Sequence, residues 1–248
     1  MIIAIANQKG GVGKTTTTIC LGGLLAQNHA CLAVDLDPQG NLTVGLGVEV
    51  EEGQLGTYDV ITEQVTAQEA IVPTASGLDL LPSDITLAKG ETEILTRVGN
   101  FMILRERLEP IAARYEYVLI DCPPSLGLLT VNGLCAADAV LVPVQCQFFA
   151  LKGLAALLET IDSVRRRLNP NLQMLGVLPT MAESNTIMTQ DVLASLRKRL
   201  GEVPIFDPVP KSVKFPESNL AGQPIHQYAG YSKLVTPYKA LVTQLAGG

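Results

Sequence analysis

The chain has 248 residues, of which 47% are hydrophobic and 4% aromatic, and it contains no tryptophan. This length is enough for one α/β domain over residues 1–248, with a core that is mainly aliphatic. The net charge of −6 argues mildly against nucleic acid as a partner. No run reaches about 18 apolar residues and no secretion signal precedes the first strand, which argues against membrane insertion and export.

Apolar runs that end in polar residues or glycine recur at the spacing of alternating strands and helices. In chain order they predict a strand over 2–6, a helix over 15–28, a strand over 30–37, a less regular stretch over 46–70, a strand over 78–84, a helix over 91–114, strands over 117–125 and 139–146, a helix over 151–168, a strand over 173–180, a helix over 186–200, an extended segment over 203–210 and a helix over 231–245. This alternation predicts an α/β fold with a mostly parallel, twisted sheet and helices on both faces.

The first predicted strand leads into NQKGGVGKTTTT, residues 7–18. Gln8 stands where the phosphate-loop pattern G-x-x-x-x-G-K-[ST] has its first glycine. The remaining glycines allow the backbone N–H groups to point at phosphate oxygens beside a helix N-terminus. We expect Lys14 to reach the β- and γ-phosphates, Thr15 to ligate Mg²⁺ and Thr16 to lie near the α-phosphate. The alternative is a glycine-rich turn before a helix capped by threonine, which the order of strand, glycines, GKT and helix disfavours.

Acidic residues end two of the predicted strands. Asp121 follows four apolar residues in YVLID, the arrangement of a Walker B acid, and Asp35 and Asp37 end ACLAVDLD. Single acids at strand ends often only cap the chain. Three that converge on one sheet edge beside a glycine loop favour a site that holds a metal's water shell and orients an attacking water.

The two parts of the chain differ in charge. Residues 1–150 carry 7 Lys and Arg against 17 Asp and Glu, whereas residues 151–248 carry 11 against 7. A basic surface in the second part would explain this difference, and so would uneven charge on solvated helices.

Five cysteines occur without a C-x-x-C pair. Their apolar surroundings predict small core residues in a reducing compartment, and a metal cluster assembled from them in space is the alternative. They are Cys20, Cys31, Cys122, Cys135 and Cys146.

Four segments together resemble the ParA family of deviant-Walker ATPases: KGGVGKTTT, VDLDPQGN, LIDCPPSLGLLTVNGL and VPVQCQFFALKGL. The similarity keeps the family's order through most of the chain and extends into PKSVKFPES and GQPIHQY. The resemblance implies a P-loop NTPase fold of the deviant Walker type, ATP and Mg²⁺ as cofactors, and ATP hydrolysis. It also implies a sandwich homodimer when ATP is bound.

The resemblance gives the extra lysine of the loop a role. Lys9 matches the family's signature lysine, which crosses the dimer interface to the phosphates of the nucleotide in the other subunit. A cation supplied in this way neutralises phosphate charge and completes the site only when two chains meet, as an arginine finger does. Lys14 would be the phosphate lysine in cis, so the two lysines would serve different nucleotides.

The same comparison implies metal and base contacts. Thr15 would ligate Mg²⁺ directly and Asp121 would bind it through water. Asp37 would belong to the metal set and position the hydrolytic water, with Asp35 supporting this acidic network. The implied nucleotide-binding residues are Lys9, Gly10, Gly11, Val12, Gly13, Lys14, Thr15 and Thr16, together with Pro208, Val209 and Pro210 against adenine.

The family also binds DNA without sequence preference in its ATP-bound dimeric form. Lys211 and Lys214 align with the family's basic pair in P-R-x-V-R, with lysine in place of arginine. The charge is kept and the bidentate fork is lost, which matters less for phosphate backbone than for base reading. A second candidate cluster could extend this patch or be a solvated helix end: Arg197, Lys198 and Arg199.

These features predict a cytoplasmic, nucleoid-associated partitioning ATPase with slow basal turnover, released from DNA when a ParB-like or McdB-like partner stimulates hydrolysis. Because Met1 directly precedes the first strand, we expect the small form without an N-terminal DNA-binding extension. The alternative is a MinD-like membrane-cycling ATPase. It would need a basic amphipathic C-terminal helix, whereas TPYKALVTQLAGG has one lysine, so no membrane partner is expected. A metal-cluster carrier would need paired ligand cysteines, and a metabolic kinase or synthetase would need a substrate pocket that the sequence does not identify.

Overall fold

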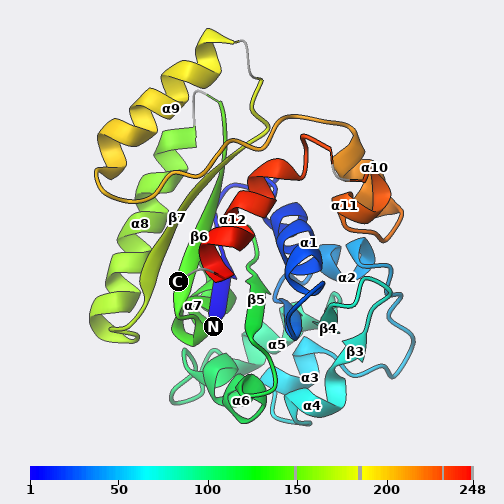
Figure 1. Cartoon of the computed structure of the whole chain (residues 1–248). Helices are drawn as coiled ribbons and strands as arrows, with labels where there is room; N and C mark the ends of the chain where they lie inside the picture. The colour runs from blue at the N-terminus through cyan, green and yellow to red at the C-terminus, as the bar shows by residue number, and fades with distance from the viewer. Residues whose placement is uncertain (148–149, 184–185, 231, 247–248) are drawn as a thin grey trace.

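The computed structural model describes residues 1–147, 150–183, 186–230 and 232–246. Within them the strands form one sheet in the order β3-β4-β2-β5-β1-β6-β7 (Figure 1). The strands are β1 Ile2–Ile5, β2 Cys31–Asp35, β3 Val72–Pro73, β4 Asp79–Leu81, β5 Tyr117–Asp121, β6 Ala139–Gln145 and β7 Gln173–Thr180. All neighbouring strands pair in parallel except β3 with β4. The predicted α/β class is therefore confirmed.

Helices cover both faces of this sheet (Figure 1). They are α1 Lys14–Leu25, α2 Asn41–Gly45, α3 Thr57–Ile61, α4 Ala67–Ala70, α5 Thr86–Ile94, α6 Ile103–Ala112, α7 Leu128–Ala136, α8 Ala150–Arg167, α9 Ile187–Leu200, α10 Lys214–Leu220, α11 Ile225–Tyr228 and α12 Thr236–Ala246.

Alternate residues of each strand face opposite helical layers, which divides the core in two. Ile3 and Ile5 of β1 pack in a cluster with residues of α1 and α12, whereas Ala4 packs in a second cluster with residues of α6 to α9. Side chains alternate across a strand, so a strand covered on both sides must be apolar at every position. This explains the short, uninterrupted apolar runs of the sequence.

One helix prediction was wrong, and other helices, α7 among them, were not predicted. The stretch 91–114 forms two helices, because Gly99 adopts a left-handed φ of 76° and Asn100 Nδ2 donates to Leu95 O at 2.7 Å, which closes the turn between α5 and α6. Helix α7 was not predicted, since it is buried on nearly all sides and lacks an amphipathic period. The predicted start of the last helix, at 231, lies outside the described residues.

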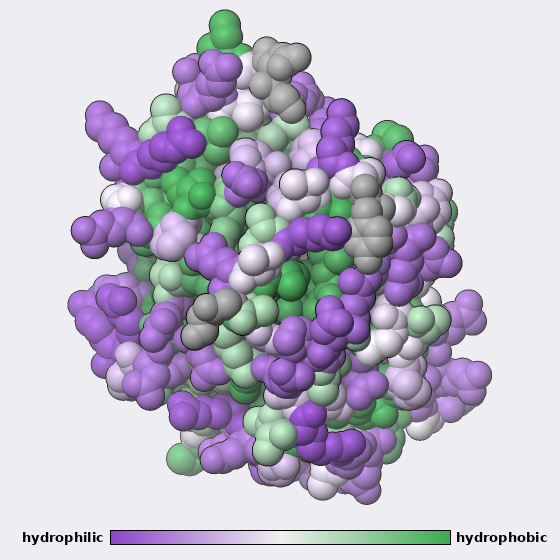
Figure 2. All heavy atoms as spheres, in the orientation of Figure 1, coloured by the Kyte–Doolittle hydropathy of each residue, from purple (hydrophilic) through white to green (hydrophobic). Residues whose placement is uncertain are grey.

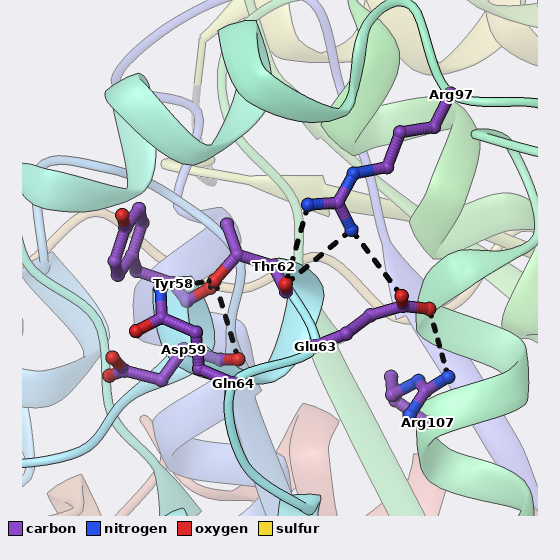
Figure 3. Close-up of polar contacts among 7 residues, drawn as sticks. All are labelled: Tyr58, Asp59, Thr62, Glu63, Gln64, Arg97 and Arg107. Atoms are coloured by element: carbon purple, nitrogen blue, oxygen red, sulfur yellow. Dashed lines mark hydrogen bonds and ion pairs between the residues drawn. The ribbon is translucent and has the colours of Figure 1, made fainter.

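A charged cluster joins α3 to the turn between α5 and α6 and to α6 itself (Figure 3). Glu63, with a left-handed φ of 66°, accepts from Arg107 Nη2 at 2.9 Å and pairs with Arg97 Nη1 at 3.5 Å. Both terminal nitrogens of Arg97 also donate to Thr62 O at 3.4 Å. These contacts connect elements that the sequence separates by more than thirty residues.

The parallel strands place their carboxyl ends at one edge of the sheet. Ile5 and Asp35 are both the register partners of Asp121, so the exits of β1, β2 and β5 lie side by side. The glycine loop and the strand-end acids therefore meet at that edge, where ligands of such sheets bind.

Candidate active site

The glycine loop forms a backbone cradle between β1 and α1. Gly11 and Gly13 have φ values of 71° and 90°, which only glycine adopts without strain, and Thr17 N donates to Gly13 O at 2.9 Å to begin the helix. Thr180 Oγ1, at the end of β7, donates to Val12 O at 2.8 Å and holds the loop from the opposite side. Consecutive N–H groups at a helix start form an anion-binding concavity.

Lys14 is the first residue of α1 and is only 7% exposed. Its Nζ lies 3.4 Å from Lys9 O, and no ion pair of Lys14 occurs among the described residues. Burial lowers the pKa of this ammonium group, although the nearby charges of Asp121 and Asp37 oppose the shift. A buried cation beside a backbone anion site is the arrangement that a bound phosphate would complete.

Asp121 lies directly behind the loop. Thr15 Oγ1 donates to its Oδ2 at 2.6 Å, and Thr18 Oγ1 donates to its Oδ1 at 3.4 Å. Burial, reinforced by the nearby charge of Asp35, raises the pKa of Asp121 to about 8. A divalent cation next to Thr15 would reverse this shift, because it would favour the ionised carboxylate.

Asp35 serves the turn that presents Asp37. Its carboxylate accepts from Thr43 N at 2.9 Å, Thr43 Oγ1 at 2.7 Å and Asp37 N at 3.1 Å, and burial raises its pKa to about 7. Gly40 closes the same turn with a φ of 63°, and a Cβ there would lie 2.7 Å from Ser83 O. This arrangement leaves Asp37 in the wall of the cleft, with its Oδ1 accepting from Gln39 N at 3.0 Å.

A cleft of about 750 Å³ opens over this edge and contains most of the predicted nucleotide-binding residues. Its lining includes Gly10, Gly11, Gly13, Lys14, Thr15, Thr16, Asp37, Val209, Pro210 and Lys211. The structure does not place Pro208, Val12 or Lys214 in this lining, and Asp121 lies behind it.

Sequence reasoning missed much of the wall opposite the loop. Val44, Phe215, Asn219 and Tyr238 line the cleft from α2, α10 and α12. Asn219 Nδ2 donates to Thr16 Oγ1 at 3.2 Å and joins the C-terminal wall to the loop. No short motif marks these positions, because they come together only through the packing of short helices far apart in the chain.

Lys9 lies outside this cleft. It lines a separate hollow of about 210 Å³ with Gln8 and Gln145. Its Nζ donates to Gln145 Oε1 at 3.0 Å and to Gln147 Oε1 at 3.2 Å, just beyond β6. Lys14 therefore lines the cleft, whereas Lys9 lines the separate hollow beside β6. The next residues of the VPVQCQFFALKGL segment, 148–149, lie outside the described residues.

The predicted basic residues do not form one cluster. Lys211 Nζ pairs with Glu183 Oε1 at 2.8 Å, and Lys214 begins α10 with an exposed side chain. The second group lies in the last turn of α9, which Figure 1 shows on the opposite side of the molecule from α10: Arg197, Lys198 and Arg199.

The described residues offer neither a membrane span nor a side-chain metal cluster. No helix there is long and apolar enough to cross a bilayer, and no three His, Cys, Asp or Glu side chains are grouped to hold a metal ion. All five cysteines are buried and free, as predicted for core residues. A metal at the cleft would thus depend on Thr15, water and ligand oxygens for coordination.

The fold and the loop define a P-loop NTPase. A family model described as an AAA domain matches residues 1–174. The chromosome partitioning protein ParA of Caulobacter vibrioides is 44% identical over 92% of this chain and 86% of its own, and Soj of Bacillus subtilis is 40% identical over 99% and 98%. The chain belongs to the ParA family of deviant-Walker partitioning ATPases.

Solved structures share the fold over nearly the whole chain. Apo McdA from Cyanothece superposes with a TM-score of 0.93 at 28% identity, covering 98% of both chains. A Mycobacterium smegmatis protein named cobyrinic acid a,c-diamide synthase, solved with an ATP analogue and magnesium, has a TM-score of 0.86 at 38% identity, covering 99% of this chain and 95% of that one.

Proposed function

We propose that this protein binds ATP with Mg²⁺ and hydrolyses it as the switch of a partitioning cycle. The observation that carries the proposal is the buried Lys14 in a glycine cradle, without an acidic partner among the described residues. An unpaired buried ammonium is costly, and the β- and γ-phosphates of a nucleotide would satisfy it. The family assignment and the ATP analogue bound to the M. smegmatis protein support the same ligand.

The residues around Thr15 fit a magnesium ion. Its hydroxyl, now bonded to Asp121 Oδ2, would ligate the metal directly, and Asp121 would hold it through water. Bound Mg²⁺ would neutralise developing phosphate charge. Asp37 lies in the cleft wall with its turn fixed by Asp35, and we infer that it positions the hydrolytic water.

We further infer that the active form is an ATP-bound sandwich dimer. The position of Lys9 supports this dimer. Its ammonium group lies outside the nucleotide cleft of its own chain and contacts two neutral amide oxygens, which the phosphates of a nucleotide in the partner chain can replace. In this form Lys211 and Lys214 would bind DNA without sequence preference. Slow basal turnover would be raised by a ParB-like or McdB-like partner, and the protein would cycle on and off the nucleoid in the cytoplasm.

Two variants test the cycle. Lys9→Ala should bind ATP and stay monomeric, because its lysine lies outside the cis cleft. Asp37→Ala should bind ATP and accumulate as a dimer, with hydrolysis reduced about 100-fold on the scale of losing a key polar group. Light scattering with ATP, paired with phosphate release, separates the two. A Lys9→Ala dimer of normal affinity would refute the role in trans.

DNA binding is tested by salt dependence. Replacing Lys211 and Lys214 by Ala should weaken binding to a random-sequence duplex and lower the slope of log K against log salt by about two. Lys214→Ala alone should leave basal ATPase nearly unchanged, because Lys214 lies outside the cleft lining. Lys89→Ala, on the exposed face of α5, is the matched control. An unchanged slope would remove these lysines from the DNA surface.

A synthase function is the second candidate, because the M. smegmatis relative carries that name at 38% identity. ATP turnover that depends on a carboxylic acid substrate, with no dimer and no DNA binding, would favour it. The MinD-like alternative is disfavoured, since Tyr238 and Leu241 of α12 are buried in the core cluster that includes α1. Hydrophilic side chains also dominate the face shown in Figure 2, where hydrophobic ones lie in smaller patches.

A further inference from the structure

A second hollow adjoins the nucleotide cleft. It measures about 480 Å³, and its walls include Glu183, Lys211, Ser212 and Lys233. The segment 210–213 lines both this hollow and the cleft. One short stretch of backbone therefore separates the expected nucleotide from a surface recess that carries two lysines.

This recess could bind an anion if the carboxylate of Glu183 were displaced from Lys211. Lys211 Nζ pairs with Glu183 Oε1 at 2.8 Å, and their side chains are 65% and 47% exposed. Lys233 is exposed and makes no ion pair with any described residue. Two ammonium groups and the Ser212 hydroxyl suit a phosphate of a nucleic-acid backbone, and Glu183 competes with that phosphate for Lys211.

Hydrogen bonds connect this ion pair to the P-loop. Thr180 Oγ1 donates to Val12 O at 2.8 Å, and two residues later Ala182 N donates to Val209 O at 3.0 Å. Lys211 N then donates to Ala182 O at 3.1 Å. Met181, inside this link, has a left-handed φ of 52° and lines the cleft. A ligand that fills the cleft would contact Met181, two residues before Glu183, and the segment 209–211, which includes Lys211.

We propose that Lys211 and Lys233 form a phosphate-binding recess for DNA and that Glu183 guards it in the nucleotide-free protein. The proposal rests on the DNA binding proposed above. An exposed ion pair is weak enough for a phosphate to displace, so Glu183 adjusts affinity and does not block the surface. Nucleotide in the cleft shifts the segment 209–211 and releases Lys211 from Glu183. Lys211 then joins Lys233 on the DNA surface.

Glu183→Gln tests the guard, with binding to a fluorescent random-sequence duplex measured without nucleotide and with a slowly hydrolysed ATP analogue. Without nucleotide, the variant should bind about threefold more tightly than wild type, the scale of an exposed ion pair. With the analogue the gain should nearly disappear. Glu109→Gln, which removes the same charge from an exposed site on α6, should gain nothing in either state.

Two further variants test whether Lys211 and Lys233 are the residues that bind the phosphate. In a Lys211→Ala background, Glu183→Gln should have no effect, because the guard acts through that lysine. Lys233→Ala should lower the salt slope by about one, whereas Lys89→Ala should leave it unchanged.

Three outcomes overturn the inference while the proposed function stands: Glu183→Gln that behaves as wild type without nucleotide, a gain that persists without Lys211, or an unchanged salt slope for Lys233→Ala. Wild-type protein that binds no DNA with the analogue overturns the proposed DNA binding and the guard together.

Discussion

Two regions of the molecule hold charged side chains in different environments: the P-loop edge of the sheet, and the joint between α3, α5 and α6. At the joint, Glu63 is paired with Arg97 and Arg107, and Arg97 also caps the carbonyl of Thr62 (Figure 3). At the P-loop edge, Lys14 is buried with only a long contact to a carbonyl.

The acids at the P-loop edge show the same contrast. Burial raises the pKa of Asp121 to about 8, and it raises that of Asp35 to about 7 although Asp35 accepts three hydrogen bonds, so burial at this edge disfavours both ionised forms. Charges that serve the fold are satisfied by other parts of the chain, whereas charges that serve a ligand are left incomplete. The P-loop edge therefore gives up stability for ligand binding, and mutations at the two regions test this difference.

The largest expected effect comes from Lys14→Ala at the P-loop edge. Removing the buried ammonium should weaken ATP binding about 100-fold, the scale of losing charge-assisted hydrogen bonds to phosphate. Titration with a fluorescent ATP analogue measures it, with Lys89→Ala as the control, and ATP-dependent dimer formation should be lost as well. Retained affinity would show that Lys14 is not the phosphate lysine.

The next effect is pH-dependent and concerns Asp121. A carboxyl whose folded pKa is raised favours folding when protonated, and this stability is lost as pH rises from about 4 through about 8. Asp121→Asn cannot ionise, so without ligand it should unfold about 5 °C above wild type at pH 8, with little difference at pH 4. Thermal unfolding at both pH values measures this. Equal melting temperatures at pH 8 would show that the site does not penalise ionisation of Asp121.

The smallest effect is expected at the joint. Glu63→Ala leaves Arg97 and Arg107 without their carboxylate and should lower the melting temperature by about 3 °C, since the pairs are partly exposed and worth about 1 kcal/mol. ATP affinity should not change. Lys89→Ala is the control, because it breaks an exposed ion pair with Glu93 that lies within one helix and joins no separate elements. Weakened ATP binding in Glu63→Ala would mean that the two regions are coupled.

Much of the fold follows from local patterns in the sequence. The six strands predicted from apolar runs all occur, because a strand buried on both faces must be apolar throughout. Helix α7 was missed for the same reason: burial on nearly all sides removes the 3.6-residue period. The break between α5 and α6 depends on Gly99 and Asn100 inside a stretch that otherwise has a helical pattern.

The sequence by itself determined the P-loop, its two lysines and the three strand-end acids, because each depends on residues close together in the chain. Only the tertiary structure decided that Lys9 lies outside its own cleft, that Asp35 organises a turn while Asp37 lines the site, and that Glu183 pairs with Lys211. These arrangements depend on contacts between distant segments, which the order of residues does not specify without the packing of the sheet.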